Sequence, residues 1–185
     1  MPTNRTEFSL GGQSGMPKFL VNYVRYVEAM NHRLGIVMKY GVLVLIGILI
    51  IEGISRYILN SPTIWSIELG EFVLGAYFSL AGGYVLLIDE HVRMDTFSSR
   101  WSERRRAIVQ LVTFSLFAIY ICTWLLGGVY NVRFAIEMNQ HYASSWGPSL
   151  APIKIILEAG ALLLFLQGVA IVIKDISILR GKVLK

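Results

Sequence analysis

Residues 65–95 read WSIELGEFVLGAYFSLAGGYVLLIDEHVRMD and give the clearest indication of how this chain folds. Residues 72–88 carry no charge, whereas carboxylates lie just before them and five of the next seven residues are charged or histidine. An apolar run of this length, bounded by charged residues and a tryptophan, predicts a helix that crosses a lipid bilayer.

Small residues form a stripe along this predicted helix. Glu68 and Glu71 lie three residues apart and therefore share one helix face. Steps of four from Glu71 reach Gly75, Ser79 and Gly83, and small residues at this spacing let another transmembrane helix approach closely. The pattern predicts a helix that holds a partner.

The composition indicates a membrane protein with several spans. Of 185 residues, 55% are hydrophobic and only 16% are charged, whereas about a quarter of a soluble domain is charged. The single cysteine, Cys122, lies in an apolar run, so we expect it to be buried and inert. One cysteine also excludes a membrane oxidoreductase that needs paired thiols.

The chain divides into four parts. We expect residues 1–16, which are polar and rich in glycine, to be disordered. Residues 17–36 show an amphipathic pattern with basic residues on the polar side, which predicts a helix lying in the membrane interface. Residues 37–176 form a transmembrane domain and residues 177–185 a cytoplasmic tail. The predicted spans are about 39–58, 67–88, 107–132 and 153–173.

The predicted fold class is therefore an all-α membrane protein, with four transmembrane helices preceded by an amphipathic interfacial helix. Its orientation follows from the basic residues. Five Lys and Arg residues precede or begin the first span, five lie between the second and third, and four follow or end the fourth. Since cytoplasmic segments carry the excess of Lys and Arg, we expect both termini in the cytoplasm. The net charge of +5 then requires no nucleic acid partner.

Charged residues also occur near the opposite ends of the helices. Glu52 and Arg56, and likewise Lys154 and Glu158, have the four-residue spacing of helical ion pairs. These charges fit either an ion or proton pathway or a polar clasp between helices. We favour the clasp, because coupling ions usually bind near the middle of the membrane. Glu68 and Glu71 would then be left without a basic residue to pair with, and we expect a partner subunit to supply a cation to at least one of them.

No pattern indicates catalysis or a cofactor. Serine-hydrolase, nucleotide-binding and dinucleotide-binding motifs are missing from the sequence. His32, His91 and His141 all lie outside the predicted spans, whereas a membrane haem needs axial ligands inside the helix bundle. We expect neither an enzyme nor a bound metal.

Several motifs resemble the DctQ-type small membrane subunit of tripartite ATP-independent periplasmic (TRAP) transporters. The similar residues are Trp65, Glu68, Glu71, Gly75-Ala76, the helix exit His91-Val92-Arg93-Met94-Asp95, Ser144-Ser145-Trp146 with Pro148, and Pro152-Ile153-Lys154. The resemblance covers roughly residues 39–174. It implies a bacterial inner-membrane scaffold without catalytic residues of its own. Its implied partners are membrane lipids, a large multi-span permease subunit that carries the sodium and substrate sites, and a periplasmic substrate-binding protein.

The expected function is therefore the small permease subunit of a sodium-coupled TRAP transporter that imports an organic acid or a similar small anion. The alternative is a self-sufficient, homodimeric four-helix carrier that uses a membrane carboxylate such as Glu52. Candidate residues of the interface with the large subunit lie on the second predicted span and its flanks. They are Trp65, Glu68, Glu71, Gly75, Ser79, Gly83, Arg93 and Asp95.

Overall fold

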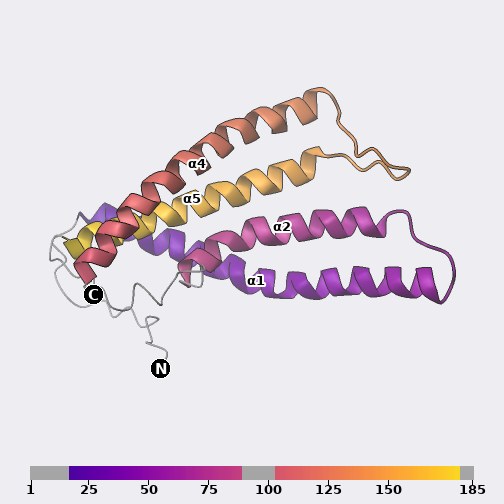
Figure 1. Cartoon of the computed structure of the whole chain (residues 1–185), viewed down its shortest axis with the longest axis horizontal. Helices are drawn as coiled ribbons and strands as arrows, with labels where there is room; N and C mark the ends of the chain where they lie inside the picture. The colour runs from indigo at the N-terminus through magenta and orange to yellow at the C-terminus, as the bar shows by residue number, and fades with distance from the viewer. Residues whose placement is uncertain (1–16, 89–102, 180–185) are drawn as a thin grey trace.

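The computed structural model describes residues 17–88 and 103–179 and consists of four long helices (Figure 1). All four are long and apolar enough to cross a membrane, and the described residues contain no strand beyond one isolated bridge between His141 and Ser149. The predicted all-α fold with four membrane-spanning helices is confirmed. The helices are α1 (Lys18–Tyr57), α2 (Ser66–Leu87), α4 (Glu103–Glu137) and α5 (Ala151–Leu179).

The helices run up and down along one axis. The start of α1 and the end of α5 lie at one end of the bundle (Figure 1). The two connections, residues 58–65 and 138–150, lie at the other end, which we call the loop end. Asn60 and Asn139 follow α1 and α4 with left-handed φ angles of 48° and 46°, which asparagine adopts more readily than most residues.

Helix α1 is longer than the sequence predicts. Its 40 residues form one continuous helix of about 60 Å, twice the roughly 30 Å of the hydrocarbon core. The helix continues without a break through the expected boundary near residue 37, because no proline lies between residues 30 and 40. The amino-terminal half packs on α5, where Val24 and Val27 are buried together with Ala170. Its position in the membrane interface stays a prediction.

Helix α5 is the centre of the bundle. It contacts α1, α2 and α4, whereas the extensive packing of α4 within the described residues is against α5 (Figure 1). The described residues therefore leave one broad side of α4 uncovered. Cys122 lies on α4 and is exposed, so the expectation of a buried thiol is wrong. An apolar run identifies a span, but it does not tell which face of the helix packs inward.

Candidate functional site

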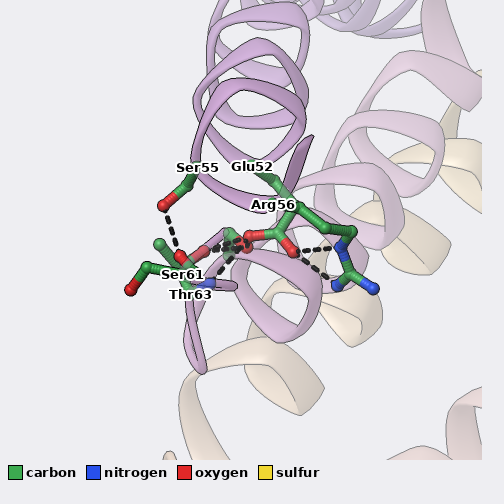
Figure 2. Close-up of polar contacts among 6 residues, drawn as sticks. Glu52, Ser55, Arg56, Ser61 and Thr63 are labelled. Carbon is green, nitrogen blue, oxygen red and sulfur yellow. Dashed lines mark hydrogen bonds and ion pairs between the residues drawn. The ribbon is translucent and has the colours of Figure 1, made fainter. Parts of the chain in front are cut away.

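Glu52 joins the end of α1 to the start of α2 (Figure 2). Its Oε1 accepts hydrogen bonds from Arg56, with 2.9 Å to Nε. Its Oε2 accepts from the backbone N of Thr63 at 3.2 Å, from the Thr63 hydroxyl, and from Ser66 Oγ at 2.6 Å. Only 9% of the residue is exposed. The predicted pair of Glu52 and Arg56 is present, but it belongs to a larger cluster.

We call this cluster of Glu52, Arg56, Thr63 and Ser66 the Glu52 clasp. It holds the connection between α1 and α2 against both helices, and Ser55 Oγ closes the same turn by donating to the Ser61 carbonyl at 2.6 Å (Figure 2). Because both carboxylate oxygens have donors, the geometry fits the structural clasp. The hydroxyl donors were not predicted, since their distance from Glu52 in sequence is set only by the turn between the helices.

Glu68 and Glu71 have different environments despite their shared helix face. Glu68 is 7% exposed, and its buried Oε2 has no hydrogen-bond partner. Glu71 is exposed and accepts a hydrogen bond of 3.1 Å from the hydroxyl of Tyr142, whose ring lies edge-on to Phe72. This hydrogen bond and the charge on Glu71, with smaller effects of burial and of Glu68, raise the pKa of Tyr142. The loop therefore supplies a hydrogen-bond donor to Glu71 but none to the buried Oε2 of Glu68.

The predicted pair of Lys154 and Glu158 does not form. Lys154 Nζ instead donates to the side-chain oxygen of Gln140 at 2.8 Å, because the loop after α4 folds back onto the start of α5. The Leu150 N–H donates to the Gln140 carbonyl at 2.9 Å, and this hydrogen bond holds the two ends of the loop together. Glu158 lies against α4, and its buried Oε1 has no hydrogen-bond partner.

The small-residue stripe faces other helices of the same chain. Ser79 Oγ donates to the Leu157 carbonyl of α5 at 3.0 Å, and a methyl group at Gly160 would lie 2.6 Å from the carbonyl atoms of Ser79. Gly75 lies near α5, and Gly83 lies against Asn31 of α1. Close approach at this stripe thus occurs within the chain. The role of Gly75, Ser79 and Gly83 toward a partner stays a prediction.

Three predicted interface residues remain, and one of them is described by the structure. Trp65 precedes α2 and is 36% exposed, so it is available to a neighbour. Arg93 and Asp95 lie outside the described residues.

A buried amide pair that was not predicted from the sequence joins three helices. Asn31 Nδ2 of α1 donates to Gln167 Oε1 of α5 at 2.8 Å, and both residues are completely buried. Gly83 of α2 provides the space for Asn31. A polar residue within an apolar stripe was the available signal, since such residues in membrane helices commonly hydrogen-bond across helices.

Comparison with known proteins identifies the family. A family model described as "Tripartite ATP-independent periplasmic transporters, DctQ component" matches residues 45–177, more than half of the chain. The match extends from the carboxyl-terminal half of α1 almost to the end of α5. No curated protein and no solved structure matches this chain. The chain belongs to the DctQ family, the small membrane subunits of TRAP transporters.

Proposed function

We propose that this chain is the scaffold subunit of a sodium-coupled TRAP transporter that imports an organic acid or a similar small anion. The observation that carries the proposal is the family match over residues 45–177. In this proposal the large multi-span permease subunit holds the sodium and substrate sites, and a periplasmic binding protein delivers the substrate. The small subunit enlarges and anchors the static part of the transporter.

The surface of the helices is consistent with a subunit surrounded by lipid and protein. Helices α1 and α4 expose large apolar side chains along most of their length. Such surfaces are covered by lipid tails or by a partner when the helices span a membrane. Examples are Tyr40, Leu43, Leu49, Leu116, Ile119, Leu126 and Tyr130.

The four helices and the family fit a multi-pass protein of the inner membrane. We propose that the loop end faces the periplasm and that both termini face the cytoplasm, because most Lys and Arg of the described residues lie toward the end opposite the loops. Single cysteines at Ser102 and Ser144 in a Cys122→Ser background test this orientation. A thiol reagent that cannot cross the membrane should label position 144 in intact spheroplasts, and labelling of position 102 alone would contradict it.

The Glu52 clasp argues against the homodimeric carrier. A carboxylate that binds and releases an ion must exchange its ligands, whereas both Glu52 oxygens are held by donors from α1, the connection and α2. Glu68 offers a different role, because its buried Oε2 still needs a donor. We propose that a Lys or Arg side chain of the large subunit supplies this donor, with Glu71 already held by Tyr142.

Reconstituted transport tests the proposed function. Proteoliposomes containing this chain, the large subunit and the binding protein should take up an organic acid along a sodium gradient. Vesicles containing only this chain should show no uptake, because the proposal places the transport sites in the large subunit. Sodium-driven uptake by the single chain would refute the scaffold role and support the carrier.

A further inference from the structure

A cavity lies between α4 and α5, in the half of the bundle nearer the loop end. Its volume is about 420 Å³. Its lining combines polar, charged and apolar side chains from both helices. They include Thr123, Trp124 and Asn131 of α4 and Lys154, Leu157 and Glu158 of α5.

The Glu158 carboxylate lies between the two helices at this cavity. It points at Gly128 of α4, where a methyl group would lie 2.8 Å from Oε1 and closer still to Oε2. The glycine therefore makes room for the carboxylate. Oε1 is buried without a hydrogen-bond partner, and Lys154, the other charged residue of the lining, donates to Gln140 of the loop.

The depth of Glu158 limits what could supply a donor. It lies seven residues after the start of α5, about 10 Å along the helix, and within the membrane-spanning segment. Lipid tails offer no hydrogen-bond donor at such a depth, and an uncompensated carboxylate there is costly. A donor carried by a neighbouring membrane helix would remove this cost. The uncovered side of α4, with Trp124 and Asn131 exposed, leaves space for such a helix.

We propose that the cavity between α4 and α5 receives a Lys or Arg side chain from a membrane helix of the large permease subunit, with Glu158 as its acceptor. This inference rests on the proposed function. Charge complementarity favours this occupant over a second copy of the chain. A two-fold related copy would present this same surface, on which the lining cation, Lys154, is already bonded to Gln140.

Co-purification of the two membrane subunits tests the proposal. The large subunit carries the affinity tag, and the variants of this chain are Glu158→Gln and Gly128→Ala. The first keeps the size of the side chain and removes its charge, and the second displaces the carboxylate without removing it. Both should weaken the complex about tenfold or more, since truncating one side of a buried charge pair commonly has at least this effect. The matched control is Glu137→Gln, at the exposed end of α4, which should bind like the wild type.

Two further measurements separate the possible outcomes. Each variant chain should elute as a single species and keep the thermal unfolding midpoint of the wild type, so that lost binding is not lost folding. A photoreactive benzoylphenylalanine at Trp124 should form an adduct with the large subunit. Wild-type binding by Glu158→Gln, or adducts only with lipid or a second copy, would overturn the proposal. Failure of the wild-type subunits to associate at all would instead overturn the proposed function.

Discussion

Gly83→Ala should disrupt the junction of α1, α2 and α5. A methyl group at position 83 would overlap Oδ1 of Asn31 and lie 3.0 Å from its Cγ. Asn31 is completely buried and bonded to Gln167, which restricts its movement. The amide must therefore shift and weaken its 2.8 Å hydrogen bond.

The expected cost combines two effects. Extra volume in a packed interior typically destabilises by about 1–3 kcal/mol. The loss of a hydrogen bond between membrane helices adds about 0.6–2 kcal/mol. Alanine also favours the helix over glycine by up to about 1 kcal/mol, which offsets part of the loss. We expect a net destabilisation of about 1–3 kcal/mol.

The neighbouring glycine provides the matched control. A methyl group at Gly82 would meet Leu164 Cδ1 at 3.6 Å, an ordinary contact, so Gly82→Ala should be neutral or slightly stabilising. The free energy of unfolding, measured in detergent by circular dichroism during denaturant titration, compares the two variants. Equal stability of the two would refute the reasoning.

A double-mutant cycle isolates the cause. Asn31→Ala alone should destabilise the protein, since it leaves the Gln167 amide buried without its partner. In the Gly83→Ala background, the same change also removes the overlap and should cost less. The two changes should therefore be non-additive by about 1 kcal/mol or more. Strict additivity would show that Asn31 is not what Gly83 accommodates.

Three further outcomes are expected. Gly160→Ala should destabilise the purified chain more than Gly83→Ala, as measured by thermal unfolding, because it meets the backbone of Ser79 rather than a side chain. Glu52→Gln should lower the free energy of unfolding by about 1–3 kcal/mol, since it removes the charge that several donors share, and an unchanged denaturation curve would contradict the clasp. Tyr142→Phe should destabilise the loop end at neutral pH, because it removes the hydrogen bond to Glu71. The pKa of Tyr142 is raised in the folded state, so this hydrogen bond is fully present below the unfolded-state pKa of the tyrosine and is lost as the pH rises through its folded-state pKa. The difference in unfolding temperature between wild type and variant should therefore vanish in strongly alkaline buffer.

The sequence was sufficient for the number of membrane-spanning helices among the described residues. Their signal is local, because a run such as residues 72–88 needs only its own composition to identify a span. The spacing of Gly75, Ser79 and Gly83 likewise indicated close helix packing, which occurs with α5 and α1. What the spacing could not tell is whether the neighbour belongs to the same chain.

The side-chain partners could not be obtained from local spacing. Lys154 and Glu158 have the spacing of a helical ion pair, but the loop brings Gln140 within 2.8 Å of Lys154. The burial of Asn31 with Gln167 depends on how α1 crosses α5, 136 residues later in the chain. Such contacts follow from tertiary packing, which outweighs the few tenths of a kcal/mol of a helical ion pair.

The membrane carboxylates differ in whether the described residues supply all of their hydrogen-bond donors. Both oxygens of Glu52 have donors within the chain, whereas Glu68 and Glu158 each have a buried oxygen without one. Native proteins rarely leave such groups unsatisfied. We therefore expect Glu68 and Glu158 to gain their donors in the assembled transporter rather than in the single chain.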